Sequence, residues 1–294
     1  MPYAHNGSVD IYYETFGDPA DPALLMINGL GSQSINYRDE MCERFVARGF
    51  FTIRFDNRDV GLSTKFDHVA PSMGAVLKAI DAGKEPEVAY RLADMATDAL
   101  AVLDELGIER AHVVGASMGG MIVQQLAIEH PERLLSMTSV MSTTGDPDVG
   151  RPTPEALAII TGPPATDRDS AIARHQESIR TYGSPAHYDA ERLALVAGEA
   201  YDRCFNPAGV ARQMQGVMAS GDRSDALRNV RVPALVIHGD ADKLIDISGG
   251  RRTAACIPGA RFEVVEGMGH DYPPAYWDRW AELVADHAGV AAKA

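Results

Sequence analysis

Short apolar runs recur along the chain and alternate with longer segments in which apolar residues follow a helical period. Most of these runs are nearly continuous in apolar residues, which is typical of strands buried on both faces of a parallel sheet. They occupy residues 23–27, 50–55, 111–114, 135–141, 234–237 and 262–265. Helical patterns lie at about residues 36–48, 88–106, 118–130, 246–257 and 275–288. The alternation predicts an α/β fold with a mostly parallel central sheet and helices on both of its faces.

Two segments depart from this alternation of strand and helix patterns. Residues 9–16 alternate in polarity, which predicts an antiparallel strand at the edge of the sheet. Residues 145–225 contain no convincing buried strand; they begin with a tract of glycines and prolines and continue as helical pieces. These pieces lie at residues 170–182, 189–204 and 208–219. We therefore interpret residues 145–225 as a helical cap, inserted into one α/β core that is formed by residues 1–144 and 226–294.

The acidic composition excludes several classes of partner. The 294 residues include 27 Lys and Arg and 41 Asp and Glu, so the formal net charge is −14. Nucleic acids and anionic membranes both favour a cationic protein surface, so neither is expected as a partner. No apolar run approaches the ~20 residues that span a bilayer, and the N-terminus lacks the features of a secretory signal. Three widely spaced cysteines indicate neither a disulfide framework nor a zinc site. We expect a cytoplasmic protein, with a homodimer as the candidate assembly.

Candidate chemistry appears at residues 115–120, which read Gly-Ala-Ser-Met-Gly-Gly. This segment follows a predicted strand, opens a predicted helix and fits the pattern G-x-S-x-G of a nucleophile elbow. The sharp turn exposes the Ser117 hydroxyl at the carboxyl edge of the sheet, where open α/β sheets bind ligands. Because the following helix directs its free N–H groups at the same point, the Met118 amide is placed to stabilise an oxyanion.

A serine hydroxyl is a weak nucleophile and needs a base that is held by a third group. His270, in Gly-Met-Gly-His-Asp at residues 267–271, follows the last predicted strand. Asp242, in His-Gly-Asp-Ala-Asp at residues 238–242, follows the strand before it. Since parallel strands end at the same edge of a sheet, Ser117, Asp242 and His270 are predicted to converge as nucleophile, acid and base.

Several alternatives compete with this interpretation. Asp240 and Asp146 are rival candidates for the acid, and His238 with Asp240 and Asp242 imitates a metal cluster, although the spacing matches no recognised zinc or calcium site. Residues 29–34 partly imitate a dinucleotide-binding fingerprint, but a serine stands where its third glycine or alanine is needed. We therefore expect neither a metal nor a cofactor.

Together, the elbow and the two later segments resemble those of the α/β-hydrolase superfamily, and the resemblance covers essentially the whole chain. More narrowly, residues 28–32 (Asn-Gly-Leu-Gly-Ser) and 54–63 (Arg-Phe-Asp-Asn-Arg-Asp-Val-Gly-Leu-Ser) are similar to those of bacterial aclacinomycin methylesterase-like esterases. The resemblance implies an α/β-hydrolase fold and assigns a second oxyanion-hole amide to Leu30. Asn28 departs from the His-Gly pair that many relatives carry at this point.

These features predict a serine carboxylic-ester hydrolase that forms an acyl-enzyme with a small to medium apolar ester. The same triad supports C–C bond hydrolysis, lactone opening or perhydrolysis, and a non-catalytic ligand-binding relative is a further alternative. Dehalogenase and epoxide hydrolase chemistry is disfavoured, because it needs a carboxylate nucleophile where this chain has Ser117.

Overall fold

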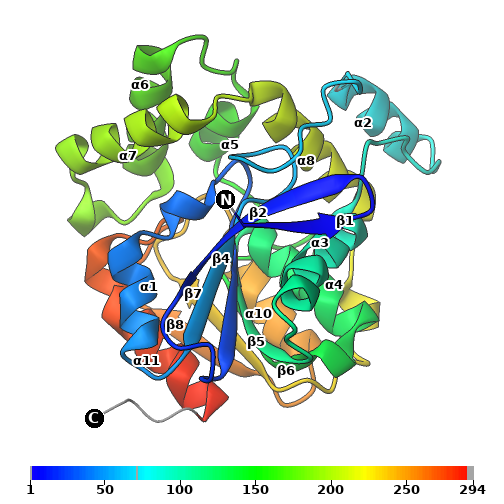
Figure 1. The fold of residues 1–294 in the computed structure, drawn as a ribbon. Helices are drawn as coiled ribbons and strands as arrows, with labels where there is room; N and C mark the ends of the chain where they lie inside the picture. Colours follow the sequence, from blue (N-terminus) through cyan, green and yellow to red (C-terminus); the bar gives the residue numbers. More distant parts are fainter. Residues whose placement is uncertain (1, 71, 290–294) are drawn as a thin grey trace.

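The computed structural model describes residues 2–70 and 72–289, in which one eight-stranded sheet forms the centre of the molecule (Figure 1). The strand order is β1-β2-β4-β3-β5-β6-β7-β8. The strands are β1 (Tyr3–Asn6), β2 (Val9–Phe16), β3 (Ala23–Ile27), β4 (Phe51–Phe55), β5 (Ala111–Ala116), β6 (Leu134–Val140), β7 (Ala234–Gly239) and β8 (Arg261–Val265). All neighbours from β4 to β8 are parallel, whereas β1 pairs with β2 and β2 with β4 in antiparallel register. The predicted mostly parallel sheet is confirmed.

Both edges of the sheet differ from the sequence-based expectation. The predicted edge strand, β2, is antiparallel as expected, but β1 lies outside it. β1 is only four residues long and has a single fully buried side chain, so its pattern is too short to be detected. β8 forms the other edge, which leaves Val264 47% exposed although its apolar run suggested burial on both faces.

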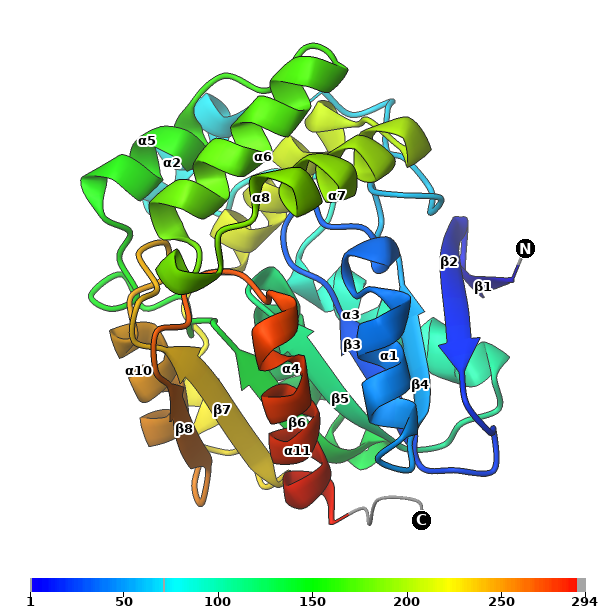
Figure 2. The ribbon, with the colours of Figure 1, turned by 90° about the vertical axis from the view of Figure 1, so that its left-hand side faces the viewer.

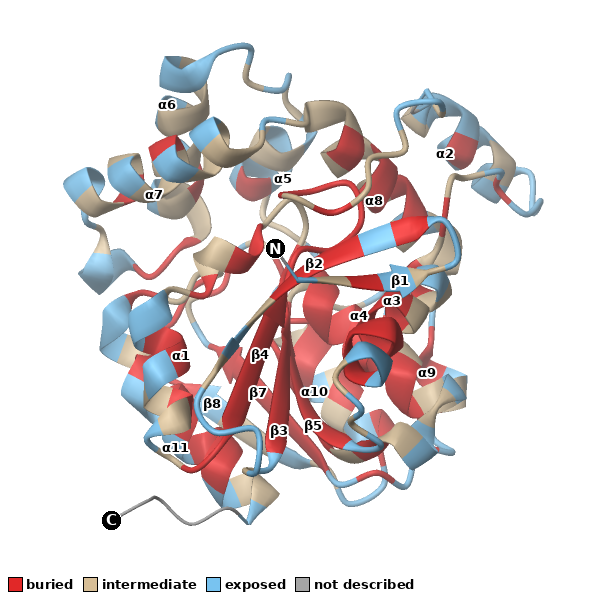
Figure 3. Cartoon of the chain, viewed as in Figure 1, coloured by how far each residue is buried: buried red, intermediate tan, exposed pale blue. Residues whose placement is uncertain are grey.

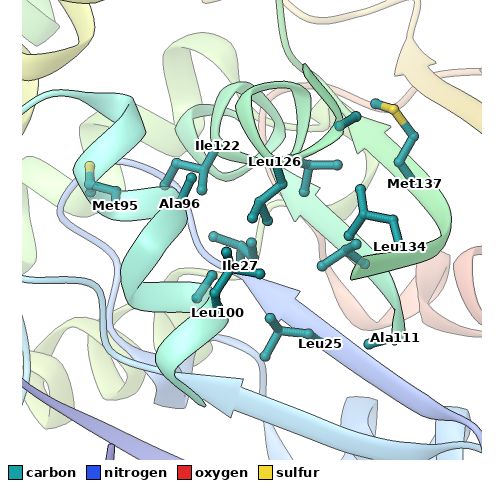
Figure 4. Close-up of a cluster of buried hydrophobic side chains, with 14 of the residues drawn as sticks. Leu25, Ile27, Met95, Ala96, Leu100, Ala111, Ile122, Leu126, Leu134 and Met137 are labelled. Carbon is teal, nitrogen blue, oxygen red and sulfur yellow. The ribbon is translucent and has the colours of Figure 1, made fainter. Parts of the chain in front are cut away.

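Helices cover both faces of the sheet because successive strand residues point to opposite sides. In β3, Leu25 and Ile27 pack into a buried cluster with residues of α3 (Leu92–Glu105) and α4 (Met118–Glu129), and Figure 4 shows this cluster. The alternate residues Leu24 and Met26 pack with α1 (Asp39–Val46) and α11 (Trp277–Ala288) on the other face. The strands are accordingly buried along most of their length, as Figure 3 shows.

Outside residues 145–225, the helices are α1 (Asp39–Val46), α2 (Met73–Asp81), α3 (Leu92–Glu105), α4 (Met118–Glu129), α10 (Ser248–Cys256) and α11 (Trp277–Ala288), with 3-10 turns η1 (Ser34–Asn36), η2 (Pro131–Arg133) and η4 (Pro274–Tyr276).

The chain between β6 and β7 forms only helices and loops, and its main helices lie beyond the carboxyl ends of the parallel strands (Figure 2). We call residues 145–225 the helical insertion. Its elements are α5 (Pro154–Thr161), α6 (Arg168–Tyr182), η3 (Pro185–His187), α7 (Ala190–Arg203), α8 (Pro207–Ser220) and the start of α9 (Ser224–Leu227). The four longer helices each begin at a side chain that accepts a hydrogen bond from the first turn, namely Thr153, Asp167, Asp189 and Asn206.

Buried polar contacts join the helical insertion to the loops of the core. Arg212 of α8 pairs with Asp59 at 2.7 Å, and Arg203 of α7 pairs with Asp56 at 2.8 Å. Gln213, which has no exposed surface, accepts from the Gly31 amide and donates to the Arg58 carbonyl, both at 2.8 Å. The loops that follow β3 and β4 are therefore held from both the core and the insertion. Within residues 2–70 and 72–289, no helix is both long enough and apolar enough to cross a membrane.

Candidate active site

Ser117 lies at a strained turn between β5 and α4. Its backbone angles are φ 57° and ψ −119°, which a residue with a side chain seldom adopts. A Cβ on Gly115 would lie 2.2 Å from the Gly119 carbonyl oxygen, and a Cβ on Gly119 would lie 2.0 Å from the Ile27 carbonyl oxygen. The two glycines therefore allow α4 to begin immediately against β3 and β5. The lack of room for side chains at Gly115 and Gly119 is the steric requirement from which the sequence motif predicted an elbow.

The three residues predicted to converge form a chain of two hydrogen-bond contacts with His270 in the middle. His270 Nε2 is 2.9 Å from Ser117 Oγ, and His270 Nδ1 is 2.7 Å from Asp242 Oδ2. An ionised carboxylate only accepts hydrogen bonds, so Nδ1 carries the proton that is donated to Asp242. The unprotonated Nε2 then accepts the hydrogen bond from the serine hydroxyl, which is the arrangement that a general base requires.

Asp242 is buried, and its surroundings favour the ionised form. Its Oδ1 accepts from the amides of Leu244 and Ile245, each at 2.9 Å. Burial alone would raise the pKa of Asp242, but the charge of His270 and hydrogen bonding by His238 and His270 outweigh it and lower the pKa to about 2. Asp242 is therefore a carboxylate at neutral pH.

The rival carboxylates have other partners. Asp240 accepts from the Gly267 amide at 2.7 Å, and Asp146 pairs with Arg252. His238 Nε2 lies 2.8 Å from the Ile245 carbonyl oxygen, which makes it a donor there, and 3.5 Å from Asp242 Oδ2. Across the described ranges, no group of three or more His, Cys, Asp or Glu side chains could hold a metal ion.

The two predicted oxyanion amides flank the elbow. In the described part of the chain, the amides of Leu30 and Met118 donate to no protein acceptor. A Cβ on Gly29 would lie 3.2 Å from Ser117 Cβ, so the turn that carries Leu30 passes next to the nucleophile. Asn28 donates to the Gln33 carbonyl at 3.0 Å and accepts from the Tyr272 hydroxyl at 3.2 Å. Asn28 thus stabilises this turn through two side-chain hydrogen bonds.

Sequence reasoning missed the contacts that hold the His270 loop. The His270 amide donates to the Tyr182 carbonyl at 2.7 Å, and the Gly269 amide donates to Ser184 Oγ at 2.9 Å. The Tyr182 ring stands edge-on to the imidazole, with centroids 6.2 Å apart. Tyr182 and Ser184 both belong to the helical insertion, and Ser184 lies 85 residues before Gly269 along the chain. No local motif signals such a contact.

Comparisons with known proteins agree with this geometry. The sequence model described as "alpha/beta hydrolase fold" matches residues 22–159. Rhodomycin D methylesterase DnrP of Streptomyces peucetius is 31% identical, over 97% of each chain. The chain belongs to the α/β-hydrolase family. Rhodomycin D methylesterase DauP of Streptomyces sp. (strain C5) is likewise 31% identical, over 96% of each chain.

Solved structures of other proteins share the fold. The enol-lactonase from Burkholderia xenovorans LB400 matches with a TM-score of 0.74 and 21% identity, over 98% of this chain and 100% of that chain. The meta-cleavage product hydrolase from Pseudomonas fluorescens IP01 matches with a TM-score of 0.76 and 18% identity, over 98% and 97% of the two chains. The expected fold is thereby confirmed, as is the expected class of carboxylic-ester hydrolase through the methylesterase relatives. The roles of Ser117, Asp242, His270, Leu30 and Met118 stay predictions.

Proposed function

We propose that this α/β-hydrolase cleaves carboxylic esters with Ser117 as nucleophile, His270 as general base and Asp242 as the group that orients the imidazole. The observation that carries the proposal is the continuous hydrogen-bonded path from Ser117 Oγ through His270 to Asp242, with contacts of 2.9 and 2.7 Å. A strained elbow and a buried carboxylate hold its two ends, so the groups are positioned before the substrate arrives.

The reaction follows from the roles of these groups. His270 removes the hydroxyl proton while Ser117 Oγ attacks the ester carbonyl carbon, and the Met118 and Leu30 amides bind the developing oxyanion. The imidazolium, stabilised by Asp242, protonates the departing alcohol. Water, deprotonated by the same imidazole, then attacks the acyl-enzyme, and the acid is released as Ser117 recovers its proton.

We propose a small to medium apolar ester as the substrate, with a methyl ester as the first choice. The similarity to two rhodomycin D methylesterases supports the methyl ester. In this proposal, residues 145–225 act as a cap over the site and determine which acyl groups enter. We also propose that the enzyme works in the cytoplasm and requires no cofactor. The mass in solution will decide between a monomer and a homodimer.

The test is a substrate panel with purified protein. Methyl and p-nitrophenyl esters of increasing acyl size are compared with lactones, carbamates and vinylogous diketones. Relatives include proteins named putative carbamate hydrolase and 2-hydroxy-6-oxononadienedioate/2-hydroxy-6-oxononatrienedioate hydrolase. We expect kcat/KM to be highest for esters, and the Ser117→Ala variant to lose several orders of magnitude in kcat. A preference for diketones or lactones would select the second candidate function. Full activity in Ser117→Ala would reject the proposed nucleophile.

A further inference from the structure

The loop that carries His270 has little regular structure of its own. β8 ends at Val265 and η4 begins at Pro274, so no strand or helix holds the residues between them. On the core side, the Met268 carbonyl accepts from the Ala241 amide at 3.1 Å, and the Tyr272 carbonyl accepts from the Trp277 indole at 2.7 Å. These contacts hold the two flanks of the loop and leave its centre to other partners.

The centre of the loop is bound by one segment of the helical insertion. Ser184 is only 1% exposed. Its hydroxyl accepts from the Gly269 amide at 2.9 Å and donates to Asp271 Oδ1 at 2.5 Å. Its own amide donates to the same carboxylate oxygen at 2.9 Å. Ser184 therefore bonds the residue before His270 and the residue after it.

The backbones of the two segments also meet without intervening side chains. The His270 amide donates to the Tyr182 carbonyl at 2.7 Å. A Cβ on Gly269 would lie 2.2 Å from the Gly183 carbonyl carbon, and a Cβ on Gly183 would lie 2.9 Å from Asp271 Oδ2. The contact is thus close enough to fix the position of the imidazole, rather than merely to cover it.

We propose that Ser184, acting through Gly269 and Asp271, is a positioning residue that holds His270 in reach of Ser117. The helical insertion then has a second role: it completes the geometry of the base as well as covering the site. This inference rests on the proposed function of His270 as general base. Asp271 belongs to the same contact, because its Oδ1 accepts hydrogen bonds from both the amide and the hydroxyl of Ser184.

Opposing effects act on the pKa of Asp271, and burial is the largest of them. Burial raises the pKa of Asp271, whereas the Ser184 hydroxyl and amide, His270 and Arg192 oppose that rise. His270 itself contacts Asp242, Ser117 and the Tyr182 ring. Replacing Asp271 by Asn keeps an oxygen acceptor for Ser184 and removes only the charge.

The main experiment compares Ser184→Ala with Ser170→Ala in steady-state ester hydrolysis. Ser170 is the control, because its amide and hydroxyl also make hydrogen bonds within the insertion, but with Asp167 at the start of α6 and not with the loop that carries His270. We expect Ser184→Ala to lower kcat about 10- to 100-fold, with KM within about twofold, because a small misplacement of the base affects the chemical step. Ser170→Ala should keep the wild-type kcat. A folded Ser184→Ala variant with wild-type kcat, or an equal loss in Ser170→Ala, would overturn the proposal.

A second variant keeps the test decisive if Ser184→Ala does not fold. Asp271→Asn should lower kcat with KM within about twofold, because the neutral amide is a weaker hydrogen-bond acceptor for the Ser184 amide and hydroxyl and so loosens the contact that positions His270. Wild-type kcat in a folded Asp271→Asn variant would contradict the inference. Failure of the proposed function is distinguishable, because it would appear as activity that survives Ser117→Ala.

Discussion

At the scale of single residues, Asp242 shows how burial and hydrogen bonding together decide the state of a site. The carboxylate is only 6% exposed, yet two backbone amides and two histidines surround it. These groups stabilise its charge more than burial destabilises it. In the proposed mechanism, a carboxylate in this place fixes the tautomer of His270 and stabilises the imidazolium that forms during catalysis.

The variant Asp242→Asn tests this role. We expect kcat to fall by about 10³- to 10⁴-fold, because the amide can donate to Nδ1 and so favour the wrong imidazole tautomer. Asp240→Asn is the control, since Asp240 follows the same strand but bonds the Gly267 amide. Comparable losses in the two variants, or near wild-type kcat in Asp242→Asn, would show that Asp242 is not the acid. The measurement is steady-state hydrolysis of a p-nitrophenyl ester.

The sequence predicted the residues of the site that follow strands and missed those that do not. Ser117, Asp242 and His270 each come shortly after an apolar run, and parallel strands bring their following residues to one edge. Ser184 lies after α6 in the insertion, and its link to Gly269 depends on how the insertion packs. Such packing has no local pattern, so single-sequence reasoning could not find it.

At the scale of elements, the elbow depends on close packing between β3, β5 and α4. Gly119 is in the first turn of α4, and any side chain there would meet the Ile27 carbonyl. The following glycine is similarly enclosed, because a Cβ on Gly120 would lie 2.6 Å from Ser142 Cβ. The helix can begin this close to β3 and β6 only because Gly119 and Gly120 have no side chains.

The variant Gly119→Ala should destabilise the protein and disturb the elbow. We expect the free energy of unfolding to fall by about 1–3 kcal/mol or more, because the added methyl group meets rigid backbone. The control is Gly74→Ala in α2, where nothing lies within 4 Å of the added Cβ. There, the higher helix propensity of alanine should raise stability by roughly 0.5–1 kcal/mol. Denaturant unfolding measures both; equal effects of the same sign would contradict this account.

Element boundaries were predicted where long apolar periods mark them and missed where they do not. The pattern at residues 88–106 corresponds to α3, and that at residues 118–130 to α4. The proline-rich start of the insertion was interpreted as a break, but Pro154 occupies the first turn of α5, where proline is tolerated. The short helix α2 was not predicted, and in the structure it buries only Val76.

At the scale of the whole molecule, buried histidines couple the stability of the fold to pH. His112 lies in β5 with its Nδ1 2.8 Å from Ser136 Oγ and its ring against Phe50. Burial, reinforced by nearby His287, lowers the pKa of His112 to about 4. The unfolded chain binds this proton near the ordinary pKa of ~6.5, so acid favours unfolding.

Folding stability should therefore fall as the pH decreases from about 6.5 to 4. His112 alone contributes up to about 3 kcal/mol of this loss, because its folded-state pKa is lowered and its neutral form is the one that fits the core. In His112→Asn the slope of stability against pH should be shallower over that window than in the wild type. Denaturant unfolding at several pH values makes the comparison. Identical slopes in the two proteins would contradict the assignment to His112.

The central claim is that Ser117 is a nucleophile activated by His270, and covalent labelling tests it most directly. Purified protein is treated with a fluorophosphonate, and the modified residue is located by mass spectrometry of its peptides. The account predicts one adduct per chain on Ser117, lost in Ser117→Ala and formed far more slowly in His270→Ala. An esterase-active protein that takes no label on Ser117, or a Ser117→Ala variant that keeps wild-type activity, would contradict it.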